Sequence, residues 1–381
     1  MIAGIGDQTN LPSHETRKDR QPPAIMNILF ISRAFPPTIG GIEKQNYEIA
    51  QGLAEISNLD LIANRKGKRA LPLFIPYVLC KAVLIARKYD VVLLGDGVLG
   101  VVGYFLKKFS RVPVVCIVHG LDLTFRNRLY QKLWVGVFLQ FQDKLIAVGN
   151  ETIRQGVLRG IPETKFAFIP NGVSVPDTLP AYTRNDLEAF IGRDIPGGVL
   201  LTLGRLVRRK GVGWFIAEAI RRLDANIIYL IAGEGRERSA IEAAIRDNGL
   251  QGRVICLGSV TEHEKSLLFC TADIFVQPNI TVSGDMEGFG LVVLEAASYG
   301  MTVIAADLEG LKDAVENGHN GFLIEEGDAD GYLAMIRSLL ANHEHLRNFG
   351  MQARQYVAEH NAWPHIAKEY LEVLTDLNVR H

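Results

Sequence analysis

Two patterns of hydrophobic positions alternate along the chain from Met26 onward. Short apolar runs, typical of parallel strands buried on both faces, are followed by longer segments with helical periodicity. The expected strands are residues 27–31, 59–62, 90–94, 113–118, 143–148 and 166–169, then 199–203, 226–231, 253–257, 273–276, 302–305 and 322–324. The expected helices are 41–56, 72–87, 97–109, 126–140 and 150–158, then 210–222, 236–248, 261–270, 289–299 and 328–341. This alternation predicts an α/β fold with two Rossmann-like, doubly wound domains facing each other across a cleft.

The segment 170–197 separates the two series, because it is rich in Pro, Asn, Gly and Asp and has neither period. We therefore expect an interdomain linker there, between an N-terminal domain over 26–180 and a second domain over 181–360. Residues 1–25 lack both periodicity and a signal-peptide core, which predicts a loose N-terminal arm and makes Met26 an alternative start. Ligands of doubly wound sheets bind beyond the carboxyl ends of the strands, so the loops that follow strands are where chemistry is expected.

Composition narrows the class of protein. The 381 residues are 48% hydrophobic with a formal net charge of -1, which excludes disordered, collagen-like and coiled-coil chains and argues against nucleic acid as a partner. The charge is unevenly distributed: residues 26–180 have 19 basic and 11 acidic side chains, net +8, and residues 181–381 have 19 and 28, net -9. The basic half is consistent with an anionic membrane surface, with a phosphorylated acceptor, or with a solvated helical face. The cations in question are Lys66, Lys68, Arg69, Lys81, Arg87, Lys88, Lys107 and Lys108.

The cysteines and the hydropathy of the chain indicate in which cellular compartment the protein is expected. The four cysteines show no C-x-x-C spacing and are expected to be buried free thiols in a reducing compartment; they are Cys80, Cys116, Cys256 and Cys270. No run reaches 18 uninterrupted apolar residues, and the longest candidate, 71–85, contains two prolines and Lys81. These features predict a cytoplasmic protein, with peripheral contact at the inner face of the membrane as the alternative that the basic half suggests.

Two glycine-rich loops follow strands in the first half. Gly40 and Gly41 immediately precede a helix, an arrangement that suits phosphate at a helix N-terminus and equally a simple turn. Residues 95–100 match G-x-G-x-x-G, but the strand that follows ends in His119 where a dinucleotide site would have an acidic residue. Because Asp122 lies beyond that strand, dinucleotide binding is not favoured.

Charged side chains also stand at strand ends. His119 precedes Gly120 at the tip of a strand, where it either projects into the cleft or is a satisfied histidine at a capped strand end. In the second half, a strand runs into residues 204–211, which contain four cations. Charge-assisted contacts to phosphate are about twice as strong as neutral hydrogen bonds, so Arg205 and Lys210 are our candidates for a diphosphate clamp; the alternative is a solvated charge run.

The segment 284–295 carries two acidic residues eight positions apart. Glu287 lies in a glycine-rich loop, and Glu295 follows four apolar residues within an expected helix. This spacing turns Glu295 inward and leaves Glu287 before the helix N-terminus, where it would be a capping acid in a purely structural interpretation. Backbone amides near Phe289, Gly290 and Leu291 would then point at an anion.

Taken together and in this order, these motifs resemble the retaining glycosyltransferases of the GT-B architecture, specifically glycosyl transferase family 4, also called group 1. The resemblance extends from about Met26 to about Leu377. It rests on Phe35-Pro36-Pro37 with Gly40-Gly41, His119-Gly120-Leu121-Asp122, Pro170-Asn171-Gly172-Val173, Gly204-Arg205 with Lys210-Gly211, Gly233-Glu234-Gly235, and the pair Glu287 and Glu295. Residues 363–374 resemble the closing helix of the family, so residues 361–381 are expected to cross back to the N-terminal domain.

The resemblance implies a nucleotide-diphosphate sugar of the UDP or GDP type as donor, and a role for each matching residue. Glu287 and His119 are implied as catalytic residues, near the sugar hydroxyls and the anomeric carbon, and Asp122 as an acceptor-side residue. The implied donor-binding residues are Gly41, Arg205, Lys210, Val260, Gly288, Phe289, Gly290, Leu291 and Glu295. Among them, Glu295 would hold the ribose, Arg205 and Lys210 the diphosphate, and Val260 would adjoin the base.

The predicted activity is retaining hexosyl transfer from this donor to an acceptor hydroxyl, lipid-linked or saccharide, in glycolipid, polysaccharide or glycoconjugate biosynthesis. No cofactor and no metal are expected, because the one D-x-D sequence, 328–330, stands where a helix should begin and Asp328 would cap it. Two alternatives remain open: a sugar-nucleotide epimerase of the same two-domain shape, and a non-catalytic subunit that binds the sugar nucleotide.

Overall fold

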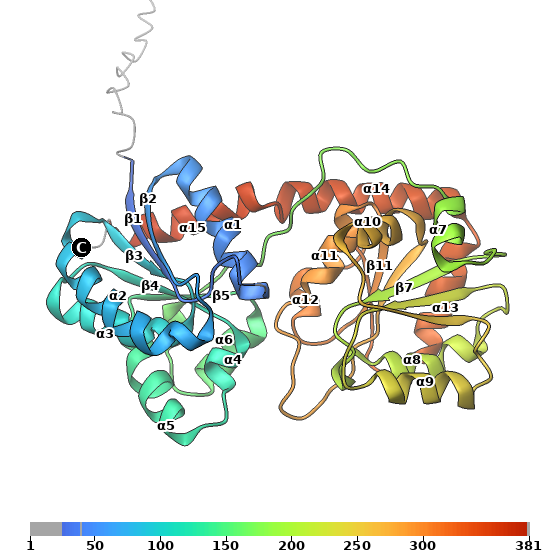
Figure 1. Ribbon diagram of the computed structural model, residues 1–381, viewed down its shortest axis with the longest axis horizontal. Helices are drawn as coiled ribbons and strands as arrows, with labels where there is room; N and C mark the ends of the chain where they lie inside the picture. The colour runs from blue at the N-terminus through green and yellow to red at the C-terminus, as the bar shows by residue number, and fades with distance from the viewer. Residues whose placement is uncertain (1–24, 39, 379–381) are drawn as a thin grey trace, which may run out of the picture.

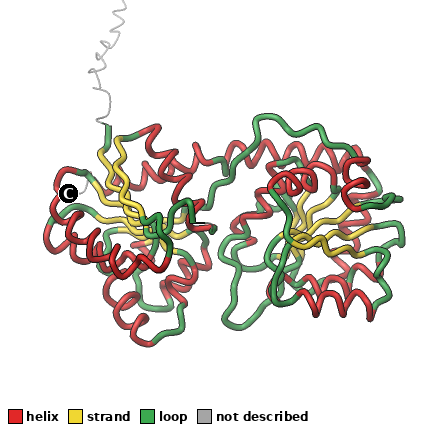
Figure 2. Tube along the Cα trace, viewed as in Figure 1, coloured by secondary structure: helices red, strands yellow, loops and turns green. Residues whose placement is uncertain are grey.

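The computed structural model describes residues 25–38 and 40–378, so the arm expected over 1–25 lies almost wholly outside the described residues. Two six-stranded sheets form the centres of two domains, and helices cover both faces of each (Figures 1 and 2). The first sheet comprises β1 (Asn27–Ser32), β2 (Asn58–Ala63), β3 (Val91–Leu94), β4 (Val114–Val118), β5 (Lys144–Ala147) and β6 (Phe166–Phe168). The second comprises β7 (Val199–Leu203), β8 (Ile228–Ala232), β9 (Val254–Gly258), β10 (Ile274–Gln277), β11 (Thr302–Ala306) and β12 (Phe322–Ile324). The predicted α/β fold with two doubly wound domains is confirmed.

All strand pairs within the two sheets are parallel, and their order determines where ligands are expected. The first sheet has the order β2-β1-β3-β4-β5-β6 and the second β12-β11-β10-β7-β8-β9. The order therefore reverses between β1 and β3 in one sheet and between β7 and β10 in the other. Crevices at such reversals are the ligand sites of open α/β sheets. The loops after β7 and β10 contain the basic run and the segment with Glu287.

Helices of the first domain divide between the two faces of its sheet. One face carries α2 (Leu71–Ile85), α3 (Gly100–Phe109) and the π-helix η4 (Gln131–Leu139), whose buried side chains form one core with the sheet. The other face carries α1 (Gly41–Ile56). The shorter elements are η1 (Lys68–Ala70), η2 (Ala86–Lys88), η3 (Gly97–Leu99), α4 (Gly120–Thr124), α5 (Arg128–Tyr130), α6 (Asn150–Val157) and η5 (Glu163–Lys165).

The second domain contains three α-helices, over 184–191, 311–314 and 343–360, that the hydrophobic pattern did not predict. Its elements are α7 (Arg184–Ile191), η6 (Arg208–Lys210), α8 (Val212–Glu218), η7 (Ile220–Arg222), α9 (Arg238–Asp247), α10 (Glu262–Thr271), α11 (Leu291–Ser298), α12 (Leu311–Ala314), α13 (Ala329–Leu340) and α14 (His343–His360). Helix α7 lies inside 170–197, so the expectation of linker throughout that segment was wrong. Thr183 and Asp186 cap it reciprocally and Leu187 is fully buried, which anchors the helix to the second domain. Helix α14, which packs on α11 and β11, was also missed.

The last helix, α15 (Trp363–Asn378), returns to the first domain. Ile366, Tyr370 and Leu374 are buried in the same core as β1, and α15 packs along α1. The backbone N–H of Val173 donates to the carbonyl of Asn361 at 2.8 Å, so the two segments that cross between the domains are bonded to each other. In Figure 1, α14 and α15 run as a nearly continuous red band across both domains.

All four cysteines are free. The expectation that they are all buried holds only for Cys116, because Cys256 and Cys270 are half-buried. Cys80 is exposed on α2, because it faces away from the sheet that Val78 and Ala82 contact.

Candidate active site

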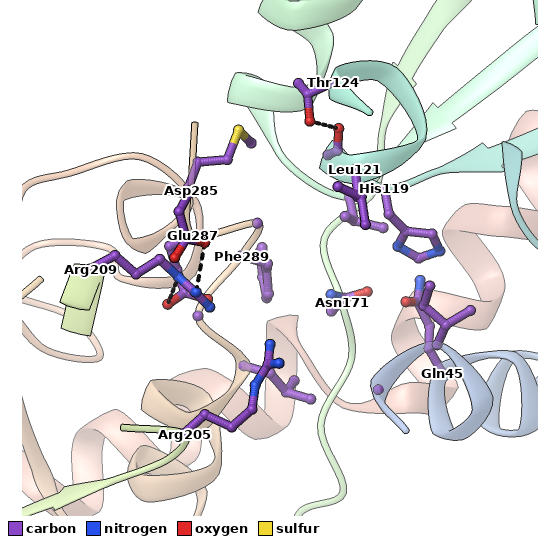
Figure 3. Close-up of a pocket in the computed structure, with 18 of the residues that line it drawn as sticks. Gln45, His119, Leu121, Thr124, Asn171, Arg205, Arg209, Asp285, Glu287 and Phe289 are labelled. Carbon is purple, nitrogen blue, oxygen red and sulfur yellow. Dashed lines mark hydrogen bonds and ion pairs between the residues drawn. The ribbon is translucent and has the colours of Figure 1, made fainter. Parts of the chain in front are cut away.

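A cavity of about 410 Å³ lies between the two domains, where the loops beyond both sheets meet. Figure 3 shows His119 and Gln45 on one side and Arg205, Arg209 and Glu287 on the other. The lining residues are Gly41, Ile42, Lys44, Gln45, His119, Gly120, Leu121, Thr124, Val148, Asn171, Arg205, Arg209, Gly284, Asp285, Met286, Glu287, Gly288, Phe289, Gly290, Leu291 and Trp363. Both domains and both crossing segments therefore contribute to one site.

On the first-domain wall, His119 follows β4 and presents an unsatisfied atom. Its Nε2 is buried and has no hydrogen-bond partner among the described residues. Burial lowers the pKa of His119, although Asp96 and a hydrogen bond with the Gly95 backbone act in the opposite direction. The imidazole is consequently neutral at pH 7, and Nε2 is available to a hydroxyl group of a ligand.

Asp122 supports this wall from behind. It is buried and is not a lining residue; its Oδ2 accepts hydrogen bonds from the backbone N–H of His119 at 2.9 Å and of Gly97 at 3.2 Å. A Cβ added to Gly97 would lie 2.8 Å from the Cβ of Asp122, so the loops after β3 and β4 are closely packed. Asp122 thus fixes the backbone from which His119 projects.

A second carboxylate, Asp96, lies in the same region and was not singled out as a functional residue. It is fully buried, forms an ion pair with Arg33 at 2.8 Å, and accepts a hydrogen bond from the Val98 N–H at 2.9 Å. Its Oδ2 has no partner among the described residues. Burial, reinforced by repulsion from Asp122 and only partly offset by Arg33, raises the pKa of Asp96 to about 6. The G-x-G pattern around Asp96 signalled a special loop but not this network.

On the second-domain wall, the basic run after β7 contains exposed cations and buried cations that form ion pairs. Arg205 is exposed and lines the cavity, and it has no ion pair among the described residues. Lys210 is buried, with its Nζ 2.6 Å from Oε2 of Glu287. Arg209, which sequence reasoning did not select, is buried too and donates to Asp285 at 2.9 Å. The structure therefore separates the two predicted clamp residues: Arg205 faces the cavity and Lys210 contacts Glu287.

Glu287 is the most constrained residue of this wall. Its side chain also lies 3.6 Å from Arg209 Nε and accepts a hydrogen bond from Asn279 at 3.2 Å, while its backbone N–H donates to Glu309 at 2.6 Å. Burial alone would raise the pKa of Glu287, but Lys210 and Arg209 outweigh it and hold the pKa below its usual value. Glu287 is accordingly an ionised carboxylate in a fixed position at the cavity.

Two helix N-termini converge on the cavity. Helix α11 starts after Gly290, whose φ of +78° favours glycine and whose Cβ would meet a Leu311 side-chain atom at 2.5 Å. Helix α1 begins at Gly41 on the opposite wall. A Cβ added at Gly41 or at Gly288 would meet nothing within 4 Å, so packing requires neither glycine. Both N-termini contribute partial positive charge to the cavity.

Three predicted donor-binding residues lie outside the lining: Lys210, which contacts Glu287, and also Glu295 and Val260. Glu295 has its Oε1 3.4 Å from Nζ of Lys44, on α1 of the opposite domain, and 3.7 Å from Lys265. Val260 is half-buried against the second-domain core. Conversely, Lys44 and Gln45 line the cavity although no motif included them, and Trp363 lines it although only its helix had been expected. Their place in the site was not predictable from local patterns, because it depends on how the two domains meet.

The D-x-D sequence is a helix start, as predicted. Asp328 accepts a hydrogen bond from the Gly331 N–H at 2.9 Å and caps α13, and Asp330 pairs with Arg222. Within the part of the chain that the structure describes, no group of three or more His, Cys, Asp or Glu side chains is arranged to hold a metal ion.

Two family models match the two domains of this chain. The model for Glycosyltransferase Family 4 matches residues 54–175, and the model for Glycosyl transferases group 1 matches residues 187–356. The chain is a group 1, family 4 glycosyltransferase. The family is one of retaining hexosyltransferases, so this GT4 protein is an enzyme of that class.

Curated relatives agree with this assignment, and solved structures share the fold. The GT4 protein is 29% identical over 293 residues to UDP-Gal:alpha-D-GlcNAc-diphosphoundecaprenol alpha-1,3-galactosyltransferase of Escherichia coli, covering 74% of this chain and 72% of that one. It is 25% identical over 385 residues to the uncharacterized glycosyltransferase MJ1607 of Methanocaldococcus jannaschii, covering 91% and 97%. A structure of Anabaena Alr3699/HepE in complex with UDP superposes with a TM-score of 0.73 at 20% identity, covering 92% of this chain and 100% of that one. Sucrose-phosphate synthase from Thermosynechococcus elongatus gives 0.72 at 20% identity, covering 93% and 100%. At such identities the structural likeness concerns the fold.

Proposed function

We propose that this GT4 protein transfers a hexosyl unit, with retention and without a metal, from a UDP-sugar to an acceptor hydroxyl. The observation that carries the proposal is the cavity between the domains, where Arg205 and the N-terminus of α11 on the second-domain wall face His119 and the N-terminus of α1 on the first-domain wall. Both helix N-termini contribute positive potential, which is strongest on the second-domain side because Arg205 adds a cation there, and the neutral His119 supplies a hydrogen-bonding group on the other side.

The positive side suits a leaving diphosphate. As the glycosidic bond to the donor breaks, negative charge accumulates on the diphosphate, and preorganised cations and amide dipoles stabilise it. Arg205 and the amides of residues 288–291 line the cavity where this charge would develop. Lys210, which is bonded to Glu287, acts by holding that carboxylate and by adding its own charge nearby.

The sugar would lie between Glu287 and His119. Glu287, kept ionised by Lys210 and Arg209, accepts hydrogen bonds from sugar hydroxyls, and Nε2 of His119 contacts the sugar from the other wall. Attack on the face from which the diphosphate leaves needs no covalent carboxylate intermediate. Closure of the domains around the donor excludes water and limits its hydrolysis. If Glu295 holds the ribose, a ribose hydroxyl at its Oε1 would compete with the contact to Lys44.

Similarity to other proteins supports our proposals for the donor base and the acceptor. The HepE structures are complexes with UDP and with UDP-glucose, and the Escherichia coli relative is named for UDP-Gal, which supports a uridine donor. That relative acts on a diphosphoundecaprenol-linked sugar, which supports a lipid-linked or saccharide acceptor in glycolipid or polysaccharide assembly.

The first experiment is a thermal-shift series with UDP-, GDP- and ADP-sugars in EDTA. A ligand at 100 times its dissociation constant stabilises the folded state by about 2.7 kcal/mol, which is readily measured. Stabilisation by UDP-sugars alone would support the proposal. No shift with any donor, with or without magnesium, would overturn it.

Arg205→Ala tests the diphosphate contact. Loss of a charged hydrogen bond of this kind weakens donor binding by about 1.5 to 3 kcal/mol, or roughly 10- to 150-fold. Arg208→Ala is the matched control, because Arg208 is exposed on the same loop but does not line the cavity. Isothermal titration of UDP-sugar should therefore separate the two variants; equal affinities would refute the role of Arg205.

A further inference from the structure

The helical layer on one face of the first sheet has an unusual charge composition. Residues 68–88, 100–111 and 125–142 contain five, three and three Lys or Arg residues, and no Asp or Glu. These segments include α2, α3 and η4, which pack side by side, α2 against α3 and α3 against η4. Ten of the eleven cations are exposed, and Lys107 pairs with Asp143 beside the layer. We call the outer surface of these three segments the basic layer.

Large apolar side chains protrude from the same layer. Leu73 and Leu84 on α2 are 81% and 82% exposed, and Tyr77 between them is 54% exposed. Phe109 and Phe141 extend the apolar surface beyond α2. Single exposed apolar residues are ordinary, but this group on adjacent elements forms an apolar surface interspersed with cations. Lys81 Nζ lies 5.7 Å from the Tyr77 ring centroid, so charge and aromatic surface are in direct contact.

Helix α2 is held flat against the sheet. Within the described residues, the helical segment Lys68–Lys88 is the one that is long and apolar enough to cross a membrane, with a mean hydropathy of 1.7 over its best window, of which 22% is buried. Val78 and Ala82 are fully buried in the core that covers the first sheet. Drawing α2 out to span a bilayer would expose that core, so its apolar outer face is presented parallel to the protein surface.

We propose that the basic layer docks on a lipid bilayer that contains anionic lipids. Lys and Arg side chains near an anionic bilayer each strengthen binding about fivefold, while Leu and aromatic side chains insert at the level of the headgroups. The absence of acidic residues from the three segments means that no like charge opposes this contact. Charge complementarity and protruding apolar side chains together fit a bilayer better than a soluble anion, which would need only the cations.

The apolar surface also leads to the cavity. Leu121 is 70% exposed and lines the cavity, and Phe125 and Leu129, the next exposed apolar residues along the chain, are 48% and 64% exposed. A bilayer on the basic layer would therefore lie beside the mouth of the site, where a lipid-linked acceptor would reach it. Docking itself does not depend on the proposed function, because neither donor nor acceptor is needed for it.

Sedimentation of the full chain with vesicles tests the proposal. We expect binding to vesicles of phosphatidylcholine with phosphatidylglycerol, none to phosphatidylcholine alone, and weaker binding as salt is raised. Lys81→Gln/Lys88→Gln/Lys108→Gln should reduce the partition coefficient roughly a hundredfold at low salt. Leu73→Ser/Leu84→Ser should reduce binding that persists at higher salt.

Matched controls remove the same groups from other surfaces. Arg246→Gln/Arg347→Gln/Lys368→Gln takes away equal charge, and Leu158→Ser/Met351→Ser takes away comparable exposed apolar area. These controls should bind vesicles like wild type, and thermal unfolding should be unchanged in every variant because the replaced side chains are exposed. No binding to anionic vesicles at low salt would overturn the proposal, as would equal losses in the controls. A change of oligomeric state confined to the basic-layer variants would also overturn it, since a second copy would then be the occupant.

Discussion

Each wall of the cavity contains a buried carboxylate, but the pKa of the carboxylate is raised on one wall and lowered on the other. On the first wall, Asp96 has an ion pair with Arg33 but is repelled by Asp122, and its pKa rises to about 6. On the second wall, Glu287 is surrounded by Lys210 and Arg209, and its pKa falls. Burial acts in the same direction on both side chains, so the ratio of cations to carboxylates decides the outcome.

This difference in charge suggests that the two walls have different roles in the site. The second wall carries a surplus of positive charge around a fixed carboxylate, which is appropriate where a diphosphate leaves. The first wall keeps a neutral His119 above two carboxylates that share one arginine. Because the pKa of Asp96 is about 6, the charge of this wall changes around that pH.

The largest expected effect comes from Lys210→Met. Removing one partner of a buried ion pair leaves an uncompensated charge, and we expect the free energy of unfolding to fall by about 3 to 5 kcal/mol, towards the lower end because Arg209 remains near Glu287. Urea unfolding measures this change.

The double variant Lys210→Met/Glu287→Met is its control. With both charges gone, most of the lost stability should return, giving a large coupling energy in a double-mutant cycle. Wild-type stability in Lys210→Met would show that the second wall does not depend on this pair.

A smaller, pH-dependent effect is expected from Asp96→Asn. Because the folded-state pKa of Asp96, about 6, lies above the ordinary value of 3.8, its contribution is fully present below pH 3.8 and is lost as pH rises through 6. The variant has no such titration. The difference between its unfolding free energy and that of wild type should therefore shift in favour of the variant by about 3 kcal/mol across this range. Urea unfolding of both proteins at several pH values provides the measurement.

Glu264→Gln is a suitable comparison, because that carboxyl is at the surface, and the helix-capping hydrogen bonds that it accepts from Thr261 outweigh a small effect of burial and lower its pKa. The difference between this variant and wild type should change in the opposite sense. As the pH rises and Glu264 ionises in wild type, the unfolding free energy of Glu264→Gln should fall relative to that of wild type. A pH-independent difference between Asp96→Asn and wild type would contradict the raised pKa of Asp96.

The smallest effect on the free energy of unfolding is expected from Lys44→Ala, which removes an ion pair between the two walls. Lys44 and Glu295 form a cross-domain ion pair at 3.4 Å, but the Lys44 side chain is 46% exposed. Lys44→Ala should change the unfolding free energy by at most about 1 kcal/mol, because exposed ion pairs are weak and screened. If Glu295 holds the donor ribose, the variant should bind UDP-sugar at least as tightly as wild type. A loss of donor affinity would instead place Lys44 itself among the donor contacts.

The twelve strands were predictable to within about two residues because parallel strands buried on both faces are continuous apolar runs. Helix α7 was not, although Thr183 and Asp186 form a capping box, because its short amphipathic pattern is surrounded by linker-like residues. Helix α14 was not predicted either, because it is largely polar and its burial depends on packing against α11 and β11.

By itself, the sequence determined the class of fold and the loops that form the site, since apolar periodicity and the motifs at strand ends are local properties of the chain. Only the tertiary structure decided which charges meet. Lys210 and Glu287 are 77 positions apart, and Lys44 and Glu295 lie on different domains, yet each pair is in contact. Whether a charged side chain is free, as Arg205 is, or paired, as Lys210 is, depends on burial and on partners brought together by folding, and no pattern along the chain encodes that directly.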